Sequence, residues 1–191
     1  MLPYLAEILG PLFGPARLFG SMLFLIGFGS ALCCALTFMA LPRLWHRLPT
    51  DQGRAFAVDA DKSVGKPVSA GLIFVPIFVI CTLIVSPLSW SIIIVGICMI
   101  GLTVFGFYDD QLGFSETALG VTDLIFSILG AVAVCELADF TIWLPFVTST
   151  FDVPAYLFVI AGSIVIWISI NATNCTDGVD GLSGSLSALA L

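Results

Sequence analysis

Two aspartates, Asp109 and Asp110, stand side by side near the middle of the chain, at the end of a long apolar run. Adjacent carboxylates at a membrane boundary repel each other, so they need a cation, a proton or water to compensate their charge. Such a pair could bind a divalent cation. In isolation, the same pair is equally typical of a solvated loop.

A second group of polar residues follows a later apolar run. Its members recur at intervals of three and are Asn171, Asn174, Asp177 and Asp180. On an α-helix, residues three apart are separated by about 300° of rotation, so Asn174, Asp177 and Asp180 drift by only about 120° in total and would share one face. The four residues form a polar stripe at the end of a span. The glycines between them would let a bulky ligand approach closely. A helix-terminating loop of aspartate and glycine is the alternative interpretation.

A basic segment runs from Arg54 to Lys66 and leads into the sequence Gly-Lys-Pro-Val-Ser-Ala-Gly at residues 65–71. Pro67 restricts the residue before it and can open a helix at its first turn. Lys62 or Lys66 could recognise a phosphate group. The basic residues could equally serve only to orient the chain in a membrane, and the sequence leaves both interpretations open.

Together, the three groups favour a reaction between phosphate-bearing partners assisted by Mg²⁺. Magnesium in proteins typically takes one or two carboxylates and completes its coordination with waters and substrate phosphates. The expected chemistry is phosphoryl transfer, which depends on positioning and charge neutralisation more than on covalent steps. The six cysteines form no C-x-x-C pair and no Cys/His cluster, so we expect neither a zinc site nor a disulfide framework.

The elements that must position these groups are membrane spans. The 191 residues are 59% hydrophobic and only 10% charged, with a mean hydropathy of +1.13, whereas soluble domains are roughly 25% charged. A span takes about 20 mostly apolar helical residues. Five segments qualify, and they cover residues 18–41, 67–85, 90–108, 121–137 and 154–170. We therefore expect an all-α integral membrane protein, a polytopic transmembrane helix bundle.

A sixth apolar run begins at Leu182 and stops at Leu191. A half-span helix would leave backbone groups unsatisfied in lipid, so we expect residues 182–191 to be the start of a longer span. The bundle would then have five full spans and the start of a sixth. The expected organisation is one transmembrane domain over residues 1–191, the N-terminal part of a larger domain.

Basic residues predict the orientation of the chain. Because Lys and Arg in short loops favour the cytoplasmic side, the basic loop between the first two spans is expected to be cytoplasmic and the N-terminus external. Counting spans forward then places the acid pair and the polar stripe on the cytoplasmic face as well. The basic residues of that loop are Arg43, Arg47, Arg54, Lys62 and Lys66.

The two acidic motifs together resemble the polyprenyl-phosphate hexose-1-phosphate transferase superfamily, glycosyltransferase family 4. The longer motif reads Asn-Ala-Thr-Asn-Cys-Thr-Asp-Gly-Val-Asp-Gly-Leu at residues 171–182, and Asp109-Asp110 ends an earlier span. Within the superfamily the chain is similar to the MraY branch, the phospho-N-acetylmuramoyl-pentapeptide transferases. That similarity includes the opening Met-Leu-Pro-Tyr-Leu-Ala-Glu, Thr176 before Asp177 and, less closely, the segment 65–71.

The resemblance implies a ten-span, Mg²⁺-dependent phosphoglycosyl transferase of the bacterial plasma membrane. It would transfer phospho-MurNAc-pentapeptide from its UDP carrier to undecaprenyl phosphate, giving lipid I and UMP for peptidoglycan synthesis. The implied partners are undecaprenyl phosphate, a UDP-linked amino sugar and the lipid bilayer, with a homodimer as a candidate assembly and no nucleic acid. Candidate catalytic residues are Asp109 and Asp110; candidate substrate-binding residues are Asn171, Asn174, Asp177, Asp180 and Lys66; candidate Mg²⁺ ligands are Asp110 and Asp177.

The chain departs from the MraY pattern in places. MraY proteins usually carry a lysine three residues after the second aspartate, where this chain has Gly113. The family's later magnesium-binding aspartate and histidine-rich loop would lie beyond Leu191, so we expect the fragment by itself to be inactive.

Three alternatives stay open. One is a WecA/TagO-type enzyme that transfers GlcNAc-1-phosphate from UDP-GlcNAc. Another, from a different class, is a cation-coupled membrane transporter, which intramembrane carboxylates such as Asp123 would suit. The third is an inactive truncated homologue.

Overall fold

The computed structural model describes residues 1–50, 64–135, 141–143, 150–176 and 182–190. The chain forms two compact units, Met1–Gly113 and Phe114–Leu191. The expectation of one transmembrane domain over residues 1–191 stays a prediction.

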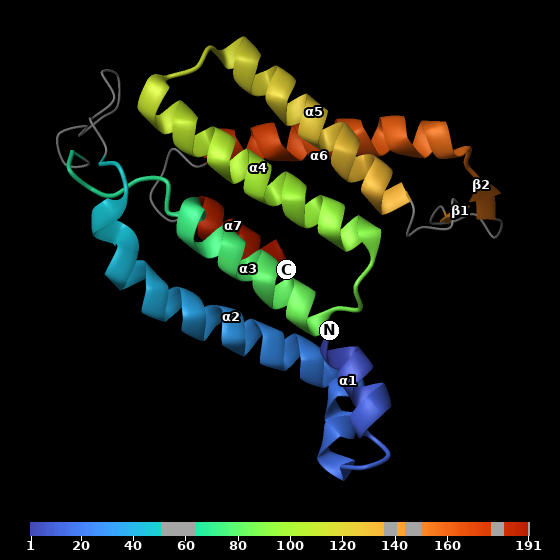
Figure 1. The fold of residues 1–191 in the computed structure, drawn as a ribbon. Helices are drawn as coiled ribbons and strands as arrows, with labels where there is room; N and C mark the ends of the chain where they lie inside the picture. Colours follow the sequence, from blue (N-terminus) through green and yellow to red (C-terminus); the bar gives the residue numbers. More distant parts are fainter. Residues whose placement is uncertain (51–63, 136–140, 144–149, 177–181, 191) are drawn as a thin grey trace. The chain divides into compact units, whose positions relative to one another are not determined.

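The first unit contains three long helices preceded by shorter ones. Figure 1 shows α2, α3 and α4 side by side, with successive helices running in opposite directions. The C-terminal ends of α2 and α4 and the N-terminal end of α3 therefore lie at one end of this unit. Its elements are α1 (Leu2–Leu9), the 3-10 helix η1 (Gly14–Gly20), α2 (Met22–Leu44), the 3-10 helix η2 (Trp45–Arg47), α3 (Gly71–Val85) and α4 (Trp90–Leu112).

Small residues let the helices of the first unit approach closely. A Cβ atom added to Gly29 of α2 would lie 3.1 Å from a Val85 methyl group of α3. One added to Gly96 of α4 would lie 3.0 Å from a Val79 methyl group, also of α3. In lipid, helices associate through such close packing because burying apolar side chains gives little driving force among equally apolar tails. The two glycines thus hold α3 between its neighbours.

The second predicted span, residues 67–85, differs from the structure. The helix α3 begins only at Gly71 and has 15 residues, because Ser69 has a left-handed backbone with a φ of 60° that a right-handed helix cannot include. At about 1.5 Å per residue, α3 is roughly 22 Å long, which is shorter than a hydrocarbon layer of roughly 30 Å.

The count of five full spans and the start of a sixth stays a prediction, because α3 is shorter than the other long apolar helices of the described residues. Four helices there are long and apolar enough to cross a membrane, at residues 22–47, 90–112, 116–135 and 155–174. Each overlaps one of the predicted spans, and the shorter apolar helix α3 occupies the place of the remaining one.

The second unit pairs two long helices, α5 (Glu116–Cys135) and α6 (Ala155–Thr176), followed by α7 (Leu182–Ala190). In Figure 1, α5 and α6 lie side by side. Ala131 of α5 is only 1% exposed, and a Cβ added to Gly162 of α6 would meet its methyl group at 3.5 Å. This contact again uses small residues to bring two helix backbones together.

Between α5 and α6 the chain forms two short strands that the sequence did not predict. Strand β1 (Thr141–Trp143) pairs antiparallel with β2 (Thr150–Asp152), and Ile142 lies opposite Phe151. Three residues per strand are a minor addition to an otherwise helical chain. The prediction of an all-α polytopic membrane protein is confirmed, with this hairpin as its one departure in the described residues.

Candidate active site

The acid pair lies in the last turn of α4, which ends at Leu112. Asp109 is half-buried and Asp110 is exposed. Adjacent residues on a helix are rotated by about 100°, so the two carboxyl groups leave the helix in different directions. The backbone carbonyl of Asp109 accepts a hydrogen bond of 2.8 Å from the N–H of Gly113, whose φ of 64° is left-handed. A glycine in this conformation is the usual way to end a helix.

The end of α4 is tied to the segment that precedes α3. The hydroxyl group of Ser69 donates a hydrogen bond to a carboxylate oxygen of Asp110, across 41 positions of sequence. Ser69 adopts its left-handed backbone at this point, a conformation that costs a non-glycine residue roughly 1–2 kcal/mol. The contact joins two of the three groups that the sequence singled out, the acid pair and residues 65–71.

The segment before α3 is held on its other side as well. Pro67 forms an isolated antiparallel bridge with Thr50, and the N–H of Val68 donates to the carbonyl of Pro49 over 2.9 Å. Lys66 lies exposed in this segment, three residues before Ser69. A candidate phosphate-binding lysine and a candidate catalytic carboxylate are thus carried at the same end of the first unit.

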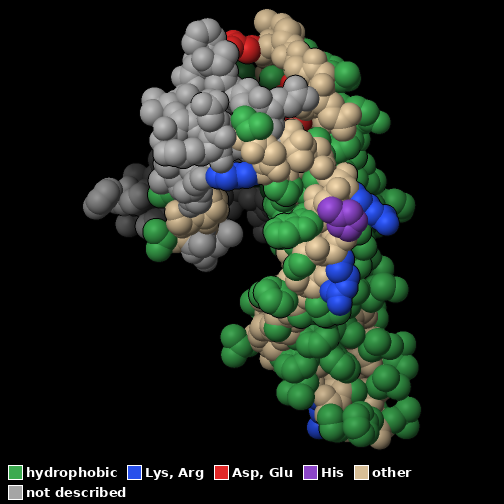
Figure 2. Space-filling view, turned by 90° about the vertical axis from the view of Figure 1, so that its left-hand side faces the viewer, with side chains coloured by type: hydrophobic (Ala, Val, Ile, Leu, Met, Phe, Trp, Pro, Cys, Tyr) green, Lys and Arg blue, Asp and Glu red, His purple; other side chains and the backbone are tan. Residues whose placement is uncertain are grey.

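Basic side chains mark this same end. Arg43 lies in the last turn of α2, and His46 and Arg47 form the following turn of 3-10 helix. Figure 2 shows blue Lys and Arg side chains next to the single histidine, with a mostly hydrophobic surface extending below it. A positively charged rim beside an apolar body is typical of the cytoplasmic boundary of a membrane protein.

The start of the polar stripe lies in the last turns of α6. The side-chain amide of Asn171 donates to the carbonyl of Trp167 over 2.9 Å, and the indole N–H of Trp167 donates to the carbonyl of Gly120 in α5 over 3.0 Å. Asn174 is exposed one turn later. Asn171 is therefore held against its own helix, which Trp167 fixes to α5. The rest of the predicted stripe, Asp177 and Asp180, lies outside the described residues.

The structure thus brings Ser69 to Asp110 in the first unit and places Asn171 and Asn174 in the second. Sequence reasoning missed two residues, Ser69 and Trp167. Ser69 was part of the segment 65–71, but nothing in its type distinguishes a tertiary donor from an ordinary residue before a helix. For Trp167 a signal existed, because an indole N–H well inside an apolar run needs an acceptor.

The donor set can be compared with what Mg²⁺ requires. Among the residues that the structure describes, no three His, Cys, Asp or Glu side chains come close enough to hold a metal ion. Magnesium needs only one or two carboxylates when waters and phosphates fill its other positions. The exposed carboxylate of Asp110 fits that requirement, whereas the second candidate ligand, Asp177, lies outside the described residues.

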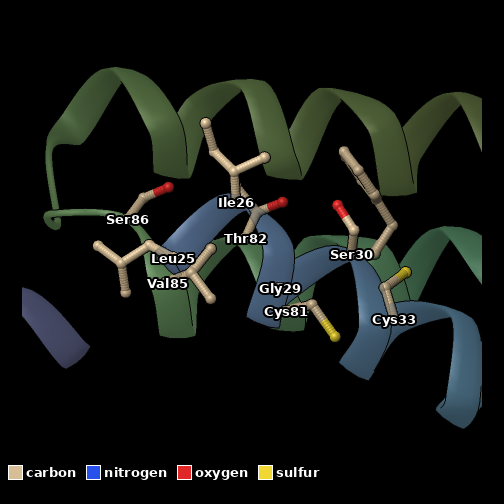
Figure 3. A pocket seen from close by; sticks show the side chains of 10 residues that line it. Leu25, Ile26, Gly29, Ser30, Cys33, Cys81, Thr82, Val85 and Ser86 are labelled. Carbon is tan, nitrogen blue, oxygen red and sulfur yellow. The ribbon is translucent and has the colours of Figure 1, made fainter. Parts of the chain in front are cut away.

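An apolar pocket of about 240 Å³ lies between α2 and α3, away from the acid pair. Figure 3 shows Leu25 and Gly29 of α2 near Val85 of α3, together with Cys33 and Cys81. Val85 is the last residue of α3 and Ser69 precedes its first, so the pocket lies toward the opposite end of that helix. Its lining offers hydroxyl and thiol groups but no charged side chain, so it does not contribute to the candidate site.

Comparison with known proteins gives a family and several relatives. The model of glycosyl transferase family 4 matches residues 90–191. A phospho-N-acetylmuramoyl-pentapeptide-transferase of Treponema pallidum (strain Nichols) is 37% identical over 187 residues, which is 94% of this chain and 51% of that protein. No solved structure gives a significant match.

Less similar relatives carry the same name. The one from Rippkaea orientalis is 35% identical and covers 84% of this chain and 47% of its own length. The one from Bartonella quintana is 28% identical, covering 78% of this chain and 46% of its own length. The chain therefore spans about half the length of the curated relatives it matches.

Proposed function

Because the chain belongs to glycosyl transferase family 4, whose model matches residues 90–191, we propose that the protein is a phosphoglycosyl transferase of the bacterial plasma membrane. Its substrates would be undecaprenyl phosphate and UDP-MurNAc-pentapeptide, and its products lipid I and UMP. The observation that carries this proposal is the 37% identity to the transferase of Treponema pallidum over 94% of the chain. The exposed Asp110 beside the segment of Lys66 is compatible with it.

In the proposed reaction, a phosphate oxygen of undecaprenyl phosphate attacks the sugar-bearing phosphorus of the UDP-sugar. A new phosphorus–oxygen bond forms, and the bond from that phosphorus to the bridging oxygen breaks, so that UMP leaves with the oxygen. Asp109 or Asp110 would accept a proton from the lipid phosphate or orient it for attack. The sequence leaves that choice open. Asp110 accepts a hydrogen bond from Ser69, in the segment before α3.

The remaining site residues have binding roles in this proposal. Bound Mg²⁺ would supply neutralisation of the phosphate charges, and we assign Asp110 and Asp177 to hold it. Lys66 would pair with a phosphate group. The polar end of α6 would contact the nucleotide-sugar, through Asn171 and Asn174 and through Asp177 and Asp180, which lie outside the described residues.

The orientation of the chain is part of the same proposal. The basic rim formed by Arg43, His46 and Arg47 supports a cytoplasmic location for the end of the first unit that carries Asp110. The N-terminus would then be external. A homodimer stays a prediction from the resemblance.

The test is the release of UMP by the full-length protein in membranes. With UDP-MurNAc-pentapeptide, undecaprenyl phosphate and Mg²⁺ present, we expect UMP to appear with equimolar lipid I. UDP-GlcNAc in place of the first substrate distinguishes the WecA/TagO alternative. No UMP from any sugar nucleotide would end the transferase proposal, and ion flux into proteoliposomes without nucleotide would favour the transporter.

A further inference from the structure

We propose that Ser69 is a positioning residue, which holds the carboxylate of Asp110 in the orientation that phosphoryl transfer requires. This inference rests on the proposed function and adds a residue to it. It starts from one contact, the hydrogen bond that the Ser69 hydroxyl donates to a carboxylate oxygen of Asp110. Ser69 itself would not touch the reacting atoms.

The backbone around Ser69 fixes the direction of its hydroxyl group. On one side, the N–H of Val68 donates to the carbonyl of Pro49 over 2.9 Å; on the other, the carbonyl of Ser69 accepts from the N–H of Leu72 over 3.1 Å in the first turn of α3. Ser69 keeps a φ of 60° between these two anchors. Unfavourable backbone conformations persist only where the surrounding structure over-determines them, and they concentrate at functional sites.

The chemistry of the contact suits positioning. A serine hydroxyl is a neutral donor, so it restricts the rotation of the Asp110 carboxylate without cancelling its charge. The carboxylate also has further lone pairs beyond the one that Ser69 uses. Asp110 can therefore be held by Ser69 and still act on a proton or a cation. A lysine in place of the serine would instead neutralise the group.

Three substitutions at Ser69 distinguish the effect of its hydroxyl donor from the effect of its left-handed backbone. Ser69→Ala removes the donor and keeps the Cβ atom; Ser69→Gly removes the donor and eases the left-handed backbone. Ser69→Asn keeps a donor and tolerates the left-handed backbone. In the full-length protein we expect Ser69→Ala and Ser69→Gly to lower kcat roughly tenfold and to raise the Mg²⁺ concentration that gives half-maximal activity. Ser69→Asn should keep most of the parental kcat and Mg²⁺ dependence.

The matched control is Ser89→Ala. The Ser89 hydroxyl accepts a hydrogen bond from the N–H of Ile92 over 3.3 Å and caps the other end of the same helix, α4. Its loss should lower the thermal unfolding midpoint (Tm) without changing the half-activating Mg²⁺ concentration. A half-activating concentration is independent of how much folded enzyme is present, so it separates positioning from a loss of stability.

A second measurement does not depend on activity. In detergent, the Tm shifts of Ser69→Ala, Asp110→Ala and the double variant form a thermodynamic cycle. We expect the double variant to lose less than the sum of the single losses, because the two side chains share one hydrogen bond. Additive shifts would contradict the contact and overturn the inference.

The outcomes distinguish this inference from the proposed function. A parent protein that releases no UMP from any sugar nucleotide overturns the proposed function, and the inference with it. A parent that is active, while Ser69→Ala keeps its Mg²⁺ dependence or Ser69→Gly keeps its full kcat, overturns the inference alone. A lower kcat in Ser69→Ala and Ser69→Gly, with most of the parental kcat kept in Ser69→Asn, supports the inference.

Discussion

The polar end of α4 and the polar end of α6 can be compared directly, because both carry candidate site residues in the last turns of a long helix. At the end of α4, Asp110 is bonded to Ser69, a residue 41 positions away, and Gly113 closes the helix. At the end of α6, Asn171 bonds to Trp167 within its own helix. The side chain of Asp110 thus has a tertiary partner, whereas the side chain of Asn171 bonds within α6, and it is Trp167 that joins α6 to α5 through Gly120.

The side chain with the tertiary partner belongs to the motif that is less specific in sequence. The motif at residues 171–182 is long and specific, whereas two adjacent aspartates are a weak signal on their own. A sequence motif identifies the side chains that a reaction needs, but it does not identify the residues that position them. Asp110 is the candidate site residue that a distant side chain holds in place, and the following substitutions measure what that contact contributes.

The largest effect is expected from Asp110→Asn. The change keeps the shape of the side chain and removes its negative charge, so we expect kcat for UMP release to fall by about 10² to 10³. Asp109→Asn, one position earlier, is measured beside it because the sequence leaves the choice of base open. If Asp110→Asn and Asp109→Asn each keep more than a tenth of the parental kcat, the acid pair at the end of α4 is not catalytic.

A smaller loss should follow Asn171→Ala at the end of α6. Removing an amide that would contact the substrate should raise the KM for the UDP-sugar about tenfold, or about 1.4 kcal/mol. The matched control is Ser169→Ala, because the Ser169 hydroxyl also donates to a carbonyl four residues earlier, at 2.7 Å. Equal KM values for the two variants would show that Asn171 only caps its own helix.

Gly113→Ala should destabilise the protein without touching the substrate. An alanine at a φ of 64° costs roughly 1 kcal/mol in backbone strain. Gly106→Ala is the control, for which we expect unchanged or higher stability. Gly106 lies inside α4 with nothing within 4 Å of an added Cβ, and alanine favours a helix interior. Thermal unfolding in detergent should give a lower Tm for the first variant and an unchanged or higher one for the second.

A loss of similar size is expected from Trp167→Phe, which removes the indole N–H that donates to the carbonyl of Gly120. One lost hydrogen bond should cost about 1 kcal/mol and lower the Tm, with little change in kcat. Trp90→Phe is the control, since Trp90 is 76% exposed. Equal Tm values for the two variants would mean that Trp167 does not fix α6 to α5.

The sequence predicted the features that depend on local composition. Apolar length placed four helices close to their observed positions and put the acid pair at the end of one of them, which the structure confirms. The start of α3 was not predicted, because the left-handed backbone at Ser69 carries no propensity signal. Nor were the contacts of Ser69 with Asp110 and of Trp167 with Gly120, because each depends on two distant segments meeting.

The 15 residues of α3 have a consequence for the surrounding lipid. A helix roughly 8 Å shorter than the hydrocarbon layer is accommodated by local thinning of the bilayer or by polar residues that reach outward. Backbone groups of residues 65–70 that are not in a helix cannot face acyl chains. Some are paired within the protein, as the N–H of Val68 is with Pro49, and the others require water or lipid headgroups. A dent in the membrane beside Asp110 would let the phosphate of a long-chain lipid meet that carboxylate without leaving its leaflet.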